Sequence, residues 1–274
     1  LAFGVTGSIP YEPPYSFARR LSTLDHLTDG RIAWNVVTGY LDSAARGVGR
    51  KRQTSHDTRY EIADEYMEVV YKLWEGSWED EAVVYDKERG VFADPDRVHR
   101  ISHDGEYFQL SAIHLCEPSP QRSPVIFQAG SSPKGQEFAA RHAECVFIGA
   151  TQPAATAERV GSLREQVVRA GREAGDLKVF AMMAVVVAET DAAAMAKFEE
   201  YESYGLMEGS LALMSGWRGV DLSRFNLDEP PRDFSEDAIQ GAGQPSSDNP
   251  TVRQLGEGLA VGGGANVIVG SPQT

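Results

Sequence analysis

The stretch PVIFQAGSSPKGQEFAARHAECVFIG, residues 124–149, contains two short apolar runs, starting at Val125 and Cys145, on either side of a segment with helical periodicity. An apolar run, a turn of small residues, a helix of about ten residues and a second apolar run form a strand–helix–strand unit. Such a crossover connection is almost always right-handed and joins two parallel strands. The stretch therefore predicts an α/β fold with a parallel sheet.

The same order of elements recurs on both sides of this stretch. Helical patterns follow the first strand and occupy about 15–30, 56–76, 154–174 and 191–205. Further strands are expected at Leu1–Ser8, Arg31–Thr38 and Leu177–Ala188, with a weaker signal at Asn266–Gly270. Helices alternating with strands along the whole chain predict a single α/β domain spanning 1–274.

Two long segments interrupt the alternation, at about 76–123 and about 205–250. The first contains HDGEYFQL (103–110), which predicts a short β-hairpin, and the second is rich in Pro, Gly, Ser and Asp, which predicts a loop. Long insertions in an α/β frame often carry function. We therefore expect both to lie over the active-site face as lids or substrate walls.

Composition restricts the classes of partner. The net charge is −14 and the pI about 4.9, which argues against nucleic acid and anionic membranes as partners. No apolar run approaches the roughly 20 residues of a membrane span. Cys116 and Cys145 are far apart and have no His/Cys spacing typical of a metal site, so we expect reduced thiols in a cytoplasmic protein and no bound metal. The patterns GxGxxG, GxxxxGK[ST], HExxH and GxSxG are absent.

The turn QAGSS allows two interpretations. If Ser132 caps the helix that begins at Pro133, the free amides of its first turn could bind a phosphate together with the hydroxyls of Ser131 and Ser132. Alternatively, Ser132 only caps the helix. Spacing alone leaves both interpretations open.

Two other groups of polar residues suit an anionic cofactor. His56 and Tyr60 are four residues apart at a helix start, so both side chains can lie near the same N-terminus, although an exposed His and a core Tyr would fit the spacing too. Thr6 and Tyr40 lie at or just beyond the ends of predicted strands, where α/β barrels build their sites. The other histidines (His26, His99, His103, His114 and His142) are expected to be structural or exposed.

Three long segments carry a family resemblance: YSFARRLSTLDHLTDGRIAWNVVTGYLDSAARGVG (15–49), HDTRYEIADEYMEVVYKLWEGSW (56–78) and SPVIFQAGSSPKGQEFAARHAECVFIG (123–149). Together they resemble the FMN-dependent monooxygenases of the bacterial luciferase-like superfamily, in the branch of the nitrilotriacetate, dibenzothiophene-sulfone and long-chain alkane enzymes. The resemblance implies a (β/α)8 TIM barrel with FMN at the C-terminal ends of the strands. By the same alignment, the first two strands and the last one would lie outside this chain.

The resemblance also implies roles for individual residues. Thr6 matches a strand-end FMN contact, His56 and Tyr60 match a pair near the flavin phosphate, and Ser131 and Ser132 fall on the phosphate-binding turn. Tyr40 matches a position that faces the flavin and the substrate, which makes it the candidate catalytic residue. The alkane enzyme has a histidine there, so Tyr40 argues against an alkane substrate.

The activity implied is a two-component monooxygenase. Reduced FMN from a separate NAD(P)H:flavin reductase would react with O2, one oxygen atom entering a small organic substrate and the other leaving as water. A homo-oligomer is also expected. The alternatives are a relative that uses a deazaflavin for hydride transfer, and a non-catalytic or remnant flavin-binding protein.

Overall fold

The computed structural model describes residues 1–130, 132–149, 152–218, 220–230, 250–257, 259, 261 and 266–273. The chain divides into two compact units. The first unit comprises residues 1–39, 54–129 and 137–146, and the second comprises residues 40–53, 130–136 and 147–274. Each unit is described on its own below.

The first unit contains a parallel sheet. Its strands are β1 (Phe3–Ser8), β2 (Ile32–Val37), β7 (Val125–Gln128) and the start of β8 (Cys145–Gly149), in the order β1-β2-β7-β8. The helices between them are α1 (Pro14–Thr28), α3 (His56–Gly76) and α4 (Pro133–His142). The strand–helix–strand unit predicted from residues 124–149 is confirmed, because β7 and β8 pair in parallel on either side of α4.

The helices cover one face of this sheet. Trp34 is fully buried on that face, with its ring centroid 4.4 Å from that of Phe17 and 6.1 Å from that of Tyr66. A Cβ atom at Gly7 would come within 2.7 Å of both Phe17 and Trp34, so only glycine lets α1 pack this closely on β1. Side chains alternate along a strand, so the residues on either side of Gly7 in β1 and of Trp34 in β2 point to the opposite face of the sheet.

We call that opposite face the open face. On β1 and β2 it carries Thr6, Ser8, Asn35 and Val37, and on β7 it carries Phe127. A Cβ atom at Gly4, which lies on the same face, would have no neighbour within 4 Å among the described atoms. The sheet is therefore apolar and closely packed on one side and partly polar on the other.

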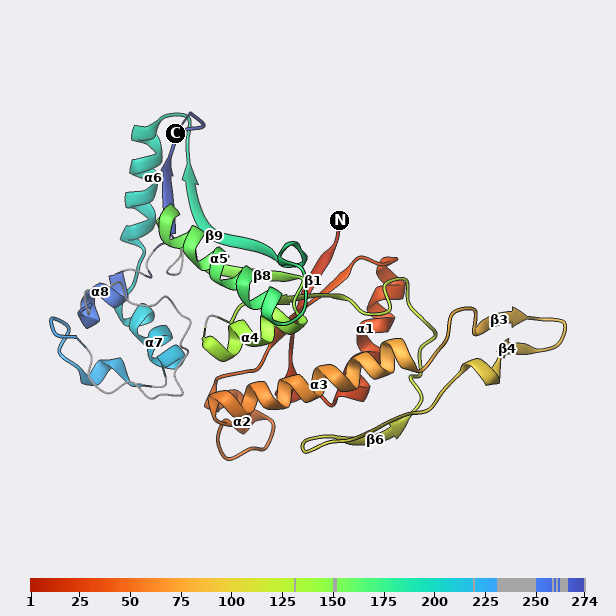
Figure 1. Ribbon diagram of the computed structural model, residues 1–274. Coiled ribbons are helices and arrows are strands. Elements are labelled where there is room, and N and C mark those ends of the chain that lie inside the picture. The colour runs from red at the N-terminus through yellow and green to blue at the C-terminus, as the bar shows by residue number, and fades with distance from the viewer. Residues whose placement is uncertain are drawn as a thin grey trace. The chain divides into compact units, whose positions relative to one another are not determined.

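The insertion at residues 77–123 builds two small hairpins, β3 (Val83–Asp86) with β4 (Val91–Ala93) and β5 (Ile101–Asp104) with β6 (Gln109–Ala112). The second confirms the hairpin predicted at 103–110. Short 3-10 helices occur at η1 (Ile9–Tyr11), before α1, and η2 (Pro95–Arg97), within the insertion. In Figure 1 the insertion extends from the C-terminal end of α3, and β3 and β4 project farthest.

The two ends of this insertion lie away from the face over which it was expected. The insertion connects the end of α3 to the start of β7, so both of its ends lie at the N-terminal ends of the strands, opposite the ends where α/β folds bind ligands. A hydrogen bond near the end of the insertion shows this position directly. The Gln121 Nε2 donates to the carbonyl of Ile32, the first residue of β2, at 2.9 Å. The ends of the segment 76–123 are therefore not at the strands' C-terminal ends, whereas its β5–β6 hairpin returns along α3, where the Tyr107 hydroxyl donates to Glu61 at 3.2 Å. A role for the segment as a lid or substrate wall stays a prediction.

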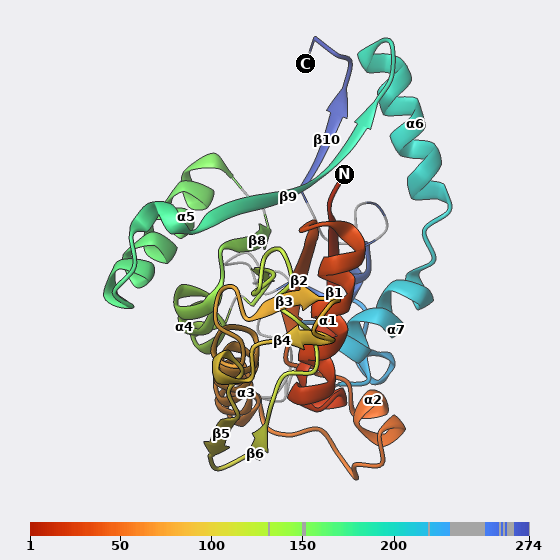
Figure 2. The ribbon, with the colours of Figure 1, turned by 90° about the vertical axis from the view of Figure 1, so that its right-hand side faces the viewer.

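The second unit contains the remaining parallel pair, β9 (Lys178–Val187) with β10 (Asn266–Gly270). Its helices are α2 (Asp42–Gly47), α5 (Pro153–Arg169), α6 (Asp191–Ser203), α7 (Met207–Arg218) and α8 (Val252–Glu257), with 3-10 turns at η3 (Ala174–Asp176) and η4 (Leu222–Arg224). Helix α6 packs against β9 and β10 (Figures 1 and 2). In the part of the chain that the structure describes, no helix is long and apolar enough to cross a membrane.

The segment predicted as a loop at 205–250 is a helix in its first part. Helix α7 places Leu211 and Met214 in a small apolar cluster with Leu222 and Val252, and this burial stabilises the helix. Residues 231–249 lie outside the described part of the chain. The six parallel strands described, one of them the weak prediction at 266–270, confirm the α/β class and are fewer than the eight of a closed barrel.

Candidate functional site

The first turn of α3 brings together several polar side chains of the first unit. His56 and Tyr60 lie on one side of the turn, with their ring centroids 5.2 Å apart. The Tyr60 ring is buried and packs against Phe138 of α4, with centroids 5.9 Å apart. The Ser55 side chain, which precedes the helix, makes no capping hydrogen bond to the first-turn amides. The turn thus combines helix-start amides, a phenol, and an imidazole whose Nδ1 lies 2.7 Å from the Asp57 carboxylate.

Arg59 belongs to the same turn and was missed from the sequence. Its side chain is buried, with 6% of the residue exposed, and its Nη1 donates to the Thr54 carbonyl at 3.2 Å. A guanidinium keeps its charge at any physiological pH, so Arg59 gives this turn a fixed positive charge that is shielded from solvent. The only signal in the sequence is that Arg59 lies three residues after His56, which places both near the same helix start.

The open face carries the second group of polar atoms of the first unit. Thr6 does not end β1, which continues to Ser8, but it lies in the C-terminal half of the strand as required of a site residue. Asn35 is the register partner of Thr6 on β2, and its Nδ2 donates to the Thr6 hydroxyl at 3.1 Å. The Ser8 hydroxyl is shielded from solvent and has no hydrogen-bond partner among the described residues.

The turn before α4 belongs to the second unit. The Ser132 hydroxyl accepts a hydrogen bond from the Gly135 amide at 3.0 Å, and the residue is only 4% exposed. The predicted helix cap is therefore confirmed. Ser131 lies outside the described residues. Tyr40 is also part of the second unit, three residues beyond the end of β2 and 40% exposed.

The histidines of the insertion and of α4 have structural roles in the first unit. His142 contacts Asp64 at 3.0 Å, and His103 contacts Glu65 at 3.1 Å. His114 is 3% exposed and its Nε2 lies 2.9 Å from the Ser22 hydroxyl. Burial lowers the pKa of His114 to about 4, so it is neutral at physiological pH. Across the described ranges, no cluster of three or more His, Cys, Asp or Glu residues is arranged to hold a metal ion.

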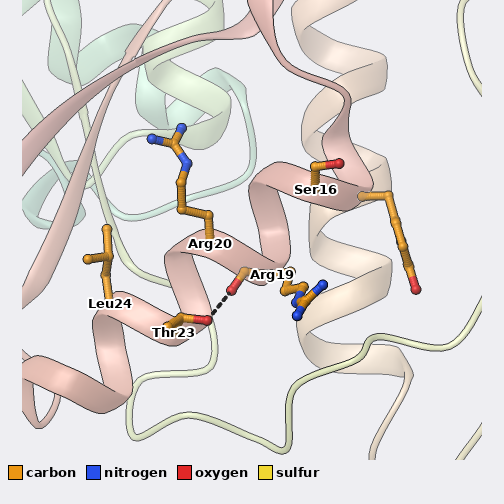
Figure 3. A pocket seen from close by; sticks show the side chains of 6 residues that line it. Ser16, Arg19, Arg20, Thr23 and Leu24 are labelled. Carbon is orange, nitrogen blue, oxygen red and sulfur yellow. Dashed lines mark hydrogen bonds between the residues drawn. The ribbon is translucent and has the colours of Figure 1, made fainter.

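A hollow of about 310 Å³ also lies on the outer surface of α1 (Figure 3). Its lining residues are Tyr15, Ser16, Arg19, Arg20, Thr23 and Leu24. Arg19 and Arg20 point in different directions in Figure 3, and Arg20 forms an ion pair with Glu12. Because the two cations do not converge, the hollow is a weaker candidate for an anionic ligand than the first turn of α3.

Comparison with known proteins identifies relatives of this chain. A family model described as luciferase-like monooxygenase matches residues 1–274. The chain is 48% identical over 278 residues to the dimethyl-sulfide monooxygenase of Hyphomicrobium sulfonivorans, with 100% of this chain and 58% of the relative covered.

Solved structures agree with this result. All of this chain superposes on 60% of a long-chain alkane monooxygenase with a TM-score of 0.88 at 45% identity. It also superposes on 61% of a riboflavin lyase solved with modified FMN and riboflavin, with a TM-score of 0.90 at 39% identity. The chain thus spans about 60% of the length of these relatives and shares their fold.

Proposed function

Because this chain belongs to the luciferase-like monooxygenase family, we propose that it is the flavin-binding part of a two-component monooxygenase that oxygenates a small organic substrate. The proposed cofactor is FMN, reduced by a separate NAD(P)H:flavin reductase, and the co-substrate is O2. We also propose that the protein is a cytoplasmic homo-oligomer. The chain would form a single partial barrel with insertions at 76–123 and 205–250. When bound, the reduced flavin would supply the electrons that activate O2.

The polar groups of the first unit fit such a cofactor. FMN carries a phosphate and a planar ring with polar edges, and the unit offers one region suited to each. The first turn of α3 supplies His56, Arg59 and Tyr60 for the phosphate, where the helix dipole adds to the charge of the guanidinium. The open face supplies Thr6 and the unpartnered hydroxyl of Ser8 for the ring. This cluster at the start of α3, in which Arg59 and Tyr60 are buried, is the observation that carries the proposal.

The second unit contributes residues of its own to the proposal. The Ser132 hydroxyl caps α4 and would also bind a phosphate oxygen, with Ser131 beside it in sequence. Tyr40 is proposed to contact the reacting centre through its phenol. A hydrogen bond to a charged group contributes about 1.5–3 kcal/mol, which corresponds to a factor of roughly 10–150 in affinity for each anchoring residue.

The anchoring assignment is tested by flavin titration in the absence of O2. Ser132→Ala combined with Tyr60→Phe should weaken the binding of reduced FMN at least tenfold, because each substitution removes one hydroxyl. Ser132→Ala also removes the cap of α4, so the fold of the variant is checked by circular dichroism. The matched control is Ser111→Ala with Tyr107→Phe, which makes the same chemical change in the β5–β6 hairpin of the insertion. If the first double variant binds reduced FMN like the control, these residues do not anchor the cofactor.

The reaction is tested with a flavin reductase and candidate substrates, using the full-length protein. Consumption of O2 coupled to substrate oxygenation supports the monooxygenase. Substrate reduction without O2 uptake would indicate the deazaflavin chemistry instead, and flavin binding without substrate turnover would indicate a non-catalytic protein.

A further inference from the structure

Two tryptophans and two tyrosines of the first unit form one connected group. The Trp34 ring centroid lies 6.1 Å from that of Tyr66 and 6.4 Å from that of Trp74. One turn back along α3, the Tyr71 centroid lies 6.5 Å from that of Trp74. Trp34 and Tyr66 are fully buried and Trp74 is 3% exposed, whereas Tyr71 is partly exposed. The group therefore extends from the packed face of the sheet to the surface of the unit.

The surroundings of the two indoles favour the movement of an electron along this group. Tryptophan and tyrosine lose one electron more readily than phenylalanine, and rings this close to one another exchange electrons rapidly. The Trp34 Nε1 donates to the Gly7 carbonyl at 3.0 Å, and the Trp74 Nε1 donates to the Ala18 carbonyl at 3.1 Å. A backbone carbonyl is too weak a base to remove the proton of an oxidised indole. An electron vacancy on either tryptophan is therefore not trapped there and passes to the next ring.

The two tyrosines differ in whether they can accept that vacancy. An oxidised tyrosine persists only after its phenol has released a proton. The Tyr66 hydroxyl is buried and has no hydrogen-bond partner among the described residues, and burial raises the pKa of Tyr66. The next ring beyond Tyr66 is that of Phe108, with centroids 5.6 Å apart, and it does not continue the path. Tyr71 is partly exposed, so water is available to take its proton.

We propose that Trp34, Trp74 and Tyr71 form an electron relay that carries oxidising equivalents from the packed face of the sheet to the surface. Trp34 lies on the strand β2 whose opposite side belongs to the open face, where the proposed function places the flavin ring. The inference rests on the proposed function for the source of the oxidant only. The relay would protect the protein when O2 is activated and no substrate is present.

The electrons and protons of this step balance as follows. The oxidant is an oxygen-centred radical, which takes one electron from Trp34 and one proton from water and becomes a closed-shell O–H product. Trp74 returns the electron to Trp34, and Tyr71 returns it to Trp74. Tyr71 then releases its phenolic proton to water and remains as a neutral radical. A thiol in solution restores the phenol by giving up one hydrogen atom, and two of the resulting sulfur radicals combine as a disulfide.

The relay is tested by an ultraviolet flash on the full-length protein without flavin, with the radicals followed by transient absorption. The flash ionises tryptophan, so tryptophan radicals form first. In the wild type their decay should produce tyrosine radicals in a first-order phase that does not depend on protein concentration. Tyr71→Phe should remove this phase, and Trp74→Phe should remove the part of it that starts from Trp34.

Tyr66→Phe is the matched control, because it makes the same chemical change at the tyrosine nearer to Trp34. Trp78→Phe is a second control, since the Trp78 ring packs on Phe92 of the β3–β4 hairpin. Both controls should keep the phase. A phase that survives in Tyr71→Phe, or that disappears in Tyr66→Phe instead, would overturn the relay. Circular dichroism checks that each variant is folded, and Tyr71→Phe decides the question if Trp74→Phe does not fold.

The protective role is tested with reduced FMN and O2 supplied in the absence of substrate, and the oxidised side chains are located by mass spectrometry. Oxidation should collect at Tyr71 in the wild type and at Trp34 and Trp74 in Tyr71→Phe. The same distribution at the tryptophans in both proteins would show that the relay carries nothing during the reaction. If the protein does not bind reduced FMN, the proposed function fails, and the flash experiment still decides whether the relay exists.

Discussion

At the scale of single residues, the structure shows the surroundings of side chains that sequence spacing left open. The spacing of His56 and Tyr60 predicted that both lie at one helix start, and their contact confirms it. Arg59 was missed because burial of a charged side chain depends on packing that one sequence does not reveal. The unsatisfied oxygen of Asn35 could not be predicted from the sequence, since it is visible only once its neighbours are placed.

His114 predicts a pH dependence of stability. Its pKa is about 4 in the folded protein because of burial, against 6.5 for an exposed histidine. Between these two values the unfolded chain binds a proton that the folded chain does not, so the free energy of unfolding falls as the pH drops from 6.5 to 4. The loss at pH 4 amounts to roughly 3 kcal/mol for this one group.

The measurement is chemical unfolding of His114→Gln at several pH values. Glutamine can still contact the Ser22 hydroxyl but does not titrate, so stability should fall less steeply below pH 6.5 than in the wild type. His99→Gln, at an exposed position, is the control and should follow the wild type. Parallel curves for His114→Gln and the wild type would contradict the prediction.

At the scale of elements, polar contacts fix the β5–β6 hairpin to α3. The Glu65 carboxylate accepts hydrogen bonds from the amides of Tyr107, at 3.0 Å, and Phe108, at 2.7 Å. His103 lies between Glu65 and the Lys72 ammonium, at 3.1 and 2.9 Å. A Cβ atom at Gly105 would overlap the Glu65 carboxylate, so the tip of the hairpin requires glycine there. These contacts attach the insertion to the helix that carries the candidate site.

Removing the charge of Glu65 should loosen the hairpin. Burial works to raise the pKa of Glu65, but hydrogen bonds from Tyr107, His103 and Phe108 outweigh it and hold the pKa below its usual value. The ionised carboxylate therefore stabilises the fold at neutral pH, and this contribution is lost as the pH falls through the lowered pKa. Glu65→Gln should cost about 1–2 kcal/mol of stability.

Hydrogen exchange at the Tyr107 and Phe108 amides measures this effect locally. Both amides should exchange faster in Glu65→Gln at pH 7, while Glu68→Gln, at an exposed position on the same helix, should leave them unchanged. Unchanged protection in both variants would show that the carboxylate does not hold the hairpin.

At the scale of the whole chain, the periodic patterns predicted the parallel strands and the helices between them, because strands and helices differ in the period of their apolar residues. The Pro- and Gly-rich composition after α6 predicted a loop, and α7 was therefore missed. Packing on Leu222 and Val252 stabilises this helix. The order of elements places only the two ends of the insertion: a segment that follows a helix and precedes a strand begins and ends on the side of the strands' N-terminal ends. The site roles of all the residues singled out from the sequence stay predictions: Thr6, Tyr40, His56, Tyr60, Ser131 and Ser132.

The position of the insertion leads to a prediction about the β3–β4 hairpin. The Asp94 amide donates to the Ala82 carbonyl at 2.8 Å, so the ends of the hairpin are adjacent and Val83–Ala93 can be replaced by Gly-Gly. The affinity for reduced FMN should change by less than about twofold, because distant sites contribute independently. Anaerobic flavin titration of the shortened protein measures it, and a tenfold loss would show that the hairpin takes part in the site.

Trp34 makes the open face observable by optical means. Its indole is fully buried, donates to the Gly7 carbonyl at 3.0 Å and is the sequence neighbour of Asn35, on the opposite side of the same strand. A buried indole emits at short wavelengths, where flavins absorb. A flavin on the open face would therefore quench the intrinsic fluorescence by energy transfer, and occupancy could be followed in the unlabelled protein without any knowledge of its substrate.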